Sequence, residues 1–125
     1  MITNFKVSED EKTVSWENEG RAKRLLFEYP VAANHIVYLD EVIVQSDTRE
    51  NGETNLAIYK ADGLVKVRPE MPKRKHKVAG VYAVWFGQGK KRVPVVLLSD
   101  EYRPYDTACT FDLETHQFFD FHPTK

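Results

Sequence analysis

The chain has 125 residues, a formal net charge of −1 and a single cysteine, Cys109. This length supports one hydrophobic core, so we expect a single domain over residues 1–125. One cysteine excludes an internal disulfide and is typical of a reducing compartment. The start of the chain has no apolar leader, and no run approaches the ~20 apolar residues of a membrane helix. The sequence therefore predicts a cytoplasmic protein that does not enter a membrane.

The first 30 residues predict three strands. Thr3–Val7 and Thr13–Glu17 alternate apolar and polar residues on either side of a polar turn, which indicates a β-hairpin. Arg21–Tyr29 fits a short helix or a strand, and we favour the strand. Pro30 ends it, because the residue before a proline is disfavoured in a helix.

Residues 35–69 predict an antiparallel meander. Its expected strands are His35–Leu39, Val42–Gln45, Thr54–Lys60 and Leu64–Arg68. Turn formers separate these strands, since Asn51-Gly52 is a turn signal and Gly63 can adopt the positive φ of a tight turn. The loop Glu70–Lys77 follows this unit.

Residues 79–123 predict a second meander on the same plan. Its expected strands are Val78–Phe86, Lys91–Ser99, Thr107–Leu113 and Phe118–His122, with a loop at Asp100–Asp106. When the chain is shifted by 53 residues, VIVQSDTRENGETNLAIY at Val42–Tyr59 lies over VVLLSDEYRPYDTACTFD at Val95–Asp112. We therefore interpret the two units as an internal repeat.

Together these elements predict an all-β domain of about nine or ten short antiparallel strands, arranged as a partial propeller, a sandwich or a distorted barrel. The turns at Asp112-x-x-Thr115 and Asp62-Gly63 resemble blade-closing turns of β-propellers of the pyrroloquinoline-quinone-dependent dehydrogenase type. The glycine and lysine that follow the threonine in that family are His116 and Gln117 here. The resemblance therefore implies a propeller fragment without cofactor binding, because a complete propeller needs about four or more blades.

No catalytic constellation stands out, and we expect neither an enzyme nor a bound cofactor or metal. Cys109 aligns with Leu56, a core position, where cysteine behaves as a small hydrophobe. The histidines lack the close spacing of zinc ligands. A hydrolase or metal site built from Asp112, His116, Asp120 and His122 is the least favoured hypothesis.

The loop Asp100–Asp106 differs from its solvated counterpart in the first unit, because it carries Tyr102, Arg103 and Tyr105. Tyrosine and arginine are enriched at the energetic centres of protein interfaces. We therefore predict a non-enzymatic protein-binding module, whose partner-binding residues are Asp100, Tyr102, Arg103, Tyr105 and Asp106. In the alternative, the two tyrosines fold back over an open end of the sheet.

A bacterial immunity protein, which neutralises a toxin domain, is the protein class that this size and composition suggest. If the toxin is a nuclease, acidic side chains are expected to mimic the phosphates of its substrate. The acidic residues considered for this role are Asp40, Glu41, Asp47, Asp100 and Asp106.

Binding of RNA or single-stranded DNA is the alternative function. Half of the 18 lysines and arginines lie in Lys66–Arg92, together with one acidic residue. The predicted phosphate-binding residues are Lys73, Arg74, Lys75, Lys77, Lys90, Lys91 and Arg92. Tyr82, Trp85 and Phe86 are candidates for stacking on bases. In the opposing interpretation, these aromatic residues are core and the lysines form a solvated linker.

Gly80–Phe86 has apolar residues at every position after the glycine. Strand alternation would place Val81, Ala83 and Trp85 on one face and Tyr82, Val84 and Phe86 on the other. We expect a central strand that is covered on both sides. If the sheet is a single layer, its second face needs a partner or a copy of itself.

Overall fold

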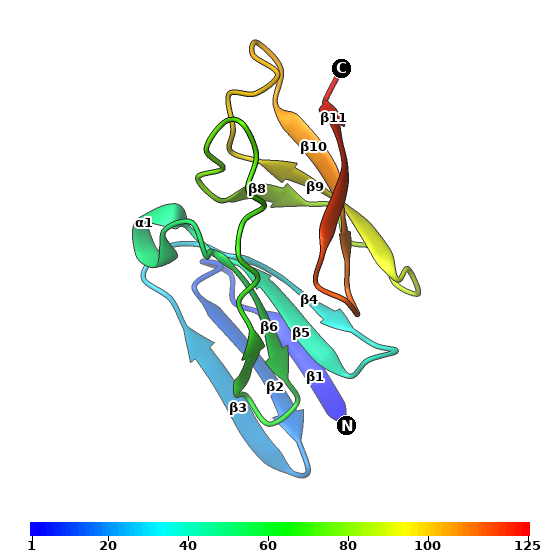
Figure 1. The fold of residues 1–125 in the computed structure, drawn as a ribbon. Coiled ribbons are helices and arrows are strands. Elements are labelled where there is room, and N and C mark those ends of the chain that lie inside the picture. Colours follow the sequence, from blue (N-terminus) through cyan, green and yellow to red (C-terminus); the bar gives the residue numbers. More distant parts are fainter.

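The computed structural model describes residues 1–125 and confirms an all-β fold with eleven strands and one short helix. The strands form three antiparallel sheets (Figure 1). Sheet A has the order β1-β2-β3, sheet B the order β4-β5-β6-β7, and sheet C the order β11-β10-β9-β8. Each sheet is built from consecutive strands, and none closes into a barrel, which removes the distorted barrel from the predicted arrangements.

Sheet A contains β1 (Ile2–Val7), β2 (Thr13–Asn18) and β3 (Arg21–Leu26). The predicted hairpin and the strand preference for the third segment are both confirmed. Alternation explains the strands, since Val14 and Trp16 on β2 are buried while the residues between and after them are not. The indole Nε1 of Trp16 donates a hydrogen bond to the Ala61 carbonyl of sheet B at 2.8 Å.

Sheet B contains β4 (Ala32–Ile36), β5 (Glu41–Gln45), β6 (Leu56–Lys60) and β7 (Val65–Val67). The loop between β5 and β6 holds the four-residue helix α1 (Thr48–Asn51), which the sequence analysis did not anticipate. Asp47 caps α1, because its carboxylate accepts a hydrogen bond from the Arg49 N–H at 2.8 Å. The helix ends at Gly52, which has a φ of 59°. No helix of the structure is long and apolar enough to cross a lipid bilayer.

Sheet C contains β8 (Val81–Val84), β9 (Arg92–Leu97), β10 (Thr107–Asp112) and β11 (Phe118–Pro123). β8 is shorter than the predicted strand Val78–Phe86. The Trp85 N–H donates to the Pro94 carbonyl at 2.9 Å, but Pro94 has no N–H to return the bond, so the ladder stops there.

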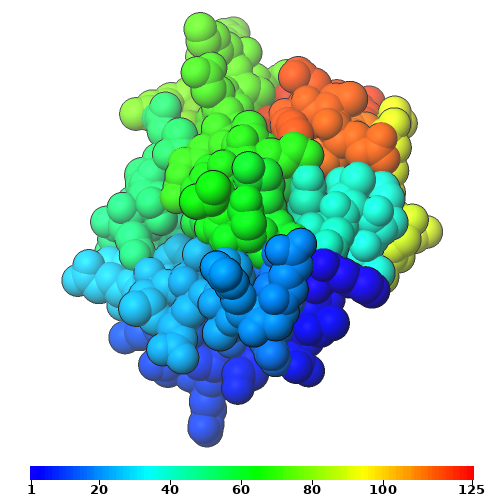
Figure 2. All heavy atoms as spheres, turned by 90° about the horizontal axis from the view of Figure 1, so that it is seen from below, coloured from blue at the N-terminus to red at the C-terminus, as the bar shows by residue number.

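The three sheets stack as layers, with sheet B in the middle. One set of sheet B side chains, which includes Ile43 and Ile58, packs against sheet C in core cluster 1. The alternate set, which includes Val42 and Val44, packs against sheet A in core cluster 2. In Figure 2 the cyan and green atoms of sheet B separate the blue atoms of sheet A from the orange and yellow atoms of sheet C. A strand buried on both faces explains the continuous apolar run of β5.

Sheets B and C are both four-stranded meanders, but the 53-residue shift does not relate their strand pairs in the same register. In sheet B, Val42 pairs with Tyr59, whereas in sheet C, Val95 pairs with Cys109 and not with Asp112. Val42 consequently faces sheet A, while Val95 faces sheet B. The internal repeat stays a prediction.

The predicted burial of both faces of Gly80–Phe86 is wrong. β8 is an edge strand that pairs only with β9, and Tyr82 and Trp85 are 62% and 68% exposed. A bulge between Val81 and Ala83 interrupts the alternation, so Val81 and Val84 face the core while Ala83 and Trp85 face away from it. The doubly covered strands are β5 and β6 instead.

Candidate functional site

The two loops singled out in the sequence lie side by side at one end of sheet C, which we call the loop end. Glu70–Lys77 leads from β7 to β8, and Asp100–Asp106 connects β9 to β10. Arg74 joins them through two hydrogen bonds to the carboxylate of Glu101, at 2.7 and 2.6 Å. The guanidinium of Arg74 also lies 3.9 Å from the ring centre of Phe121. This arrangement fixes the base of the Asp100–Asp106 loop on sheet C.

Ion pairing shapes the Asp100–Asp106 loop itself. The carboxylate of Asp100 forms a salt bridge with the guanidinium of Arg103 at 2.8 Å. Hydrogen bonding to Arg103 lowers the pKa of Asp100 below its usual value. The backbone N–H of Arg103 donates to the Asp100 carbonyl at 3.1 Å, and the N–H of Tyr105 donates to the Tyr102 carbonyl at 2.9 Å. The loop therefore consists of two successive turns.

Four of the five predicted partner-binding residues of this loop are exposed. The side chain of Arg103 is 74% exposed and Tyr105 is 44% exposed, while Asp100 and Asp106 also face solvent. Tyr102 is half-buried, in line with the alternative in which the tyrosines fold back. The loop thus presents one tyrosine and one arginine to solvent on a fixed base.

The seven predicted phosphate-binding residues do not form one patch. Lys73–Lys77 precedes β8 at the loop end, whereas Lys90–Arg92 follows β8 at the opposite end of sheet C, which we call the hairpin end (Figure 1). Four of the seven pair with carboxylates: Arg74 with Glu101, Lys77 with Glu53, Lys91 with Asp112 and Glu114, and Arg92 with Asp112. Lys73, Lys75 and Lys90 have no ion pair.

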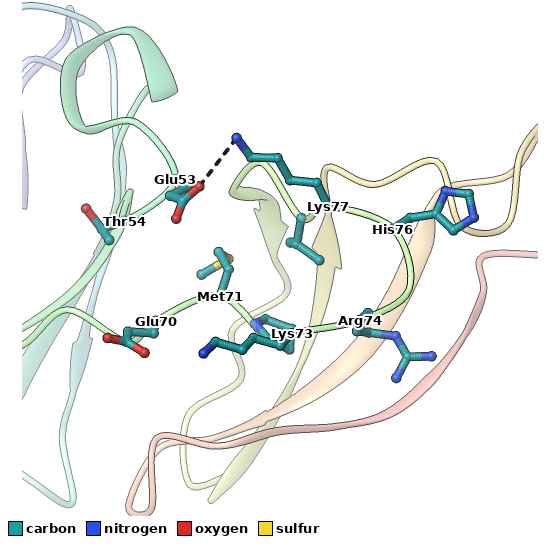
Figure 3. A pocket seen from close by; sticks show the side chains of 10 residues that line it. Glu53, Thr54, Glu70, Met71, Lys73, Arg74, His76 and Lys77 are labelled. Atoms are coloured by element: carbon teal, nitrogen blue, oxygen red, sulfur yellow. Dashed lines mark ion pairs between the residues drawn. The ribbon is translucent and has the colours of Figure 1, made fainter.

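A shallow pocket of about 550 Å³ lies between the Glu70–Lys77 loop and the end of the α1 segment. Figure 3 shows the Lys77–Glu53 ion pair across it, with a nitrogen–oxygen distance of 3.8 Å, while Arg74 and His76 point away from Glu53. Met71 and Val78 are its hydrophobic lining residues. Because charges of both signs line the pocket and its ion pair joins two solvent-exposed side chains, we assign it no chemistry.

Cys109 is a core residue, as the sequence analysis predicts. It is 2% exposed in core cluster 1, and burial raises the pKa of its thiol to about 12. A thiol in this environment stays protonated and is a poor nucleophile at neutral pH.

The residues of the least favoured hypothesis, a metal or hydrolase site near the last turn, do not form a cluster of metal ligands. Asp112 is buried, and its Oδ1 accepts hydrogen bonds from the N–H groups of Glu114 and Thr115 at 2.8 and 2.9 Å. Burial alone would raise the pKa of Asp112, but these bonds and the nearby Arg92 lower it below its usual value. Asp120 and His122 are exposed, and no cluster of three or more His, Cys, Asp or Glu has the arrangement of a metal site. Asp112 thus fixes a turn.

The acidic residues expected to mimic phosphates are also dispersed. They lie in the β4–β5 turn, on the first residue of β5, at the cap of α1 and in the Asp100–Asp106 loop. Four of them are paired: Asp40 with the N-terminal amine, Glu41 with Lys66, Asp47 with Arg49, and Asp100 with Arg103. They form no common acidic surface.

Two of the three aromatic residues proposed to stack on bases, Tyr82 and Trp85, are exposed on and just after β8. Phe86 is half-buried and packs against core cluster 1. Pro94, directly across from Trp85 on β9, is the sequence signal that would have shown β8 to end early. Comparison of the chain with known proteins finds no matching family model, no matching curated protein and no matching solved structure.

Proposed function

We propose that the chain is a non-catalytic protein-binding module whose partner contacts the Asp100–Asp106 loop. The observation that carries this function is the exposure of Arg103 and Tyr105 on a loop whose base is fixed by the Arg74–Glu101 ion pair. An ordered loop loses less conformational entropy on binding than a mobile one, so its exposed side chains contribute more of their contact energy to affinity.

The proposed partner is a folded protein, and its narrower class is a toxin domain that the chain neutralises as a bacterial immunity protein in the cytoplasm. The support for this class is analogy of size and composition. Mimicry of phosphates is not part of the proposal, because the acidic side chains are dispersed and mostly paired. Contact through tyrosine and arginine is the recognition mode that the loop offers.

The test begins with affinity capture of the tagged chain from its native host and identification of the retained protein. The dissociation constant of that purified partner is then measured for the wild type, Tyr105→Ala and Arg103→Ala. We expect each substitution to weaken binding by at least about 30-fold if the residue is an energetic centre of the interface. Tyr38→Ala is the matched control, since Tyr38 is 45% exposed on the β4–β5 turn, and Tyr105 is 44% exposed.

An equal loss of affinity in the Tyr38→Ala control would mean that the loop has no special role. Capture that retains no partner under several extraction conditions would remove the proposal itself. Toxicity of the partner gene, relieved by coexpression of this chain, would establish the narrower immunity class.

Nucleic-acid binding is a second candidate, favoured by the exposure of Tyr82 and Trp85 on the same strand edge. Trp85 fluorescence gives a direct readout, because the other tryptophan, Trp16, is buried. A titration with single-stranded RNA or DNA at two salt concentrations should show quenching that weakens steeply with salt. No quenching at low salt would exclude this candidate.

A further inference from the structure

The face of sheet C that points away from sheet B is uncovered, and we call it the outer face. Strand pairing arranges its side chains in two rows. The row nearer the loop end contains Ala83, Val96, Ala108 and His122, and the row nearer the hairpin end contains Trp85, Pro94, Thr110 and Phe119. The residues between them along each strand, including Val95 and Phe111, face core cluster 1.

The composition of this outer face differs from that of the corresponding face of sheet A. The outward positions of sheet A include Lys6, Glu17 and Arg24, as expected of a face in contact with water. The two rows of sheet C contain no lysine, arginine, aspartate or glutamate, and they expose Trp85. Beyond the hairpin-end row, the same face continues with the ion-paired Arg92 and Asp112, and the Arg92 guanidinium lies 5.0 Å from the ring centre of Phe119. Two uncharged rows with an exposed tryptophan are typical of a surface that binds another protein.

The shapes of the two rows are complementary to each other. The loop-end row is small at three of its four positions, Ala83, Val96 and Ala108, whereas the hairpin-end row carries Trp85 and Phe119. A two-fold axis that crosses the strands at right angles, parallel to the sheet, would place the larger row of one copy over the smaller row of another. Face-to-face sheets commonly pack with their strands nearly aligned, which this axis permits.

Two unpaired charges, at opposite ends of the two rows, are compatible with the same two-fold axis. Lys90, at the hairpin end, has no ion-pair partner within the chain. Asp106, at the loop end, is exposed and is likewise without an ion pair. The same two-fold axis would bring the end that carries Lys90 in one copy to the end that carries Asp106 in the other. Shape and charge therefore select one orientation.

We propose that the outer face of sheet C binds a second copy of this chain, related by a two-fold axis across the strands. The interface places Trp85 of each copy over Ala83 of the other. This inference uses Asp106 of the Asp100–Asp106 loop but not its tyrosines or arginine, and it stands without the proposed function.

The first test measures molar mass by sedimentation across a range of concentrations for the wild type, Trp85→Ala and Leu26→Ala. The wild type is expected to be a dimer, and Trp85→Ala is expected to raise the dimer dissociation constant by at least about 30-fold. Leu26 is the matched control because it is 72% exposed on the opposite layer, sheet A. Near-ultraviolet circular dichroism checks that each variant remains folded.

The second test examines orientation with charge reversals. Lys90→Asp and Asp106→Lys should each weaken the dimer, and the double variant should restore it, because the two ends then exchange their charges. A wild type that remains monomeric at the highest concentration would overturn the proposal, as would a dimer unaffected by Trp85→Ala. Failure of the double variant to restore the dimer would overturn the two-fold arrangement.

Discussion

The side chain of Asn55 hydrogen-bonds to the backbone at the free edge of β8, as a neighbouring strand would. Its Nδ2 donates hydrogen bonds to the carbonyls of Ser46 and Val81, and its Oδ1 accepts one from the Val81 N–H, all at 2.8 Å. The residue is 1% exposed, so these bonds link sheets B and C away from water. Gly80 belongs to the same contact, since a Cβ at this position would lie 2.9 Å from Asn55 Oδ1.

Substitution of Asn55 by alanine should therefore lower the free energy of unfolding by about 3 kcal/mol, because it leaves buried backbone groups without partners. Urea denaturation of the purified variant measures this change. Asn51→Ala is a suitable comparison, since the Asn51 side chain donates a single hydrogen bond, to Ser46 Oγ, and the residue is half-buried. Equal stability of the two variants would contradict the role assigned to Asn55.

His116 should make the fold sensitive to mild acid. Burial lowers the pKa of His116 below its ordinary value of 6.5, and the nearby Lys66 lowers it further, against the opposite effects of Glu41 and Asp112. The unfolded chain therefore binds this proton more readily than the folded one. The contribution of the uncharged His116 to the free energy of unfolding should be fully present above pH 6.5. It should fall as the pH drops from there through the lower pKa of the folded state.

Unfolding free energies measured between neutral pH and pH 5 would show this slope, and His116→Asn should reduce it. Asparagine suits the position because the backbone φ of His116 is 62°, a left-handed conformation that asparagine tolerates. An unchanged slope in the variant would assign the acid sensitivity to another group.

At the scale of elements, local alternation predicted which segments form strands better than it predicted their limits and surroundings. The predicted strand His35–Leu39 overlaps β4 (Ala32–Ile36) only at His35 and Ile36. The hairpin of sheet A and the four-strand order of sheets B and C follow from apolar spacing and turn residues. The early end of β8 depends on Pro94 of the neighbouring strand, and the exposure of Trp85 depends on β8 being an edge. These are properties of strand pairing, which the residues of one segment do not encode.

Composition singled out the two candidate loops, Glu70–Lys77 and Asp100–Asp106, but it did not predict that they lie side by side. Arg74 looked like a phosphate ligand within a basic run, and it instead joins Glu101, 27 residues away. Asn55 gave no signal at all, because it was expected within the strand Thr54–Lys60, whereas β6 begins at Leu56. Ion-pair partners in a folded β-protein come from distant segments, so the residues of one segment do not reveal how its charges pair.

Removal of the Arg74 side chain should release the Asp100–Asp106 loop. The Arg74→Ala variant is expected to exchange the backbone amides of Arg103 and Tyr105 at least about tenfold faster, because local opening then breaks fewer contacts. Arg74→Lys should restore little of the protection of these amides, since lysine cannot form the bidentate contact with Glu101. Lys75→Ala, at an exposed neighbour without an ion pair, is the control in hydrogen-exchange mass spectrometry. Unchanged amide exchange in Arg74→Ala would mean that the two turns of the loop keep it ordered without the Arg74–Glu101 ion pair.

At the scale of the whole molecule, sheet B is shared by both core clusters. Ile58 of β6 lies in core cluster 1, and Trp16 of β2 lies in core cluster 2, each almost fully buried. A defect in either cluster weakens the packing of the same central sheet. The three layers should therefore unfold together in a single transition.

Ile58→Ala should lower the free energy of unfolding by about 3 kcal/mol and Trp16→Ala by about 4 kcal/mol, through lost burial and the cavities left behind. Scanning calorimetry should give one peak for each variant, with equal calorimetric and van't Hoff enthalpies. Two peaks in either variant would show that sheet A or sheet C melts on its own.

The burial of Cys109 has a practical consequence for the study of this molecule. The native chain offers no ionised, accessible sulfur to alkylating dyes, since its one thiol is enclosed and has a pKa of about 12. A cysteine introduced on any solvent-facing strand would then be the sole attachment point for a fluorophore or spin label. Distances within an assembly could be measured on an otherwise unaltered protein.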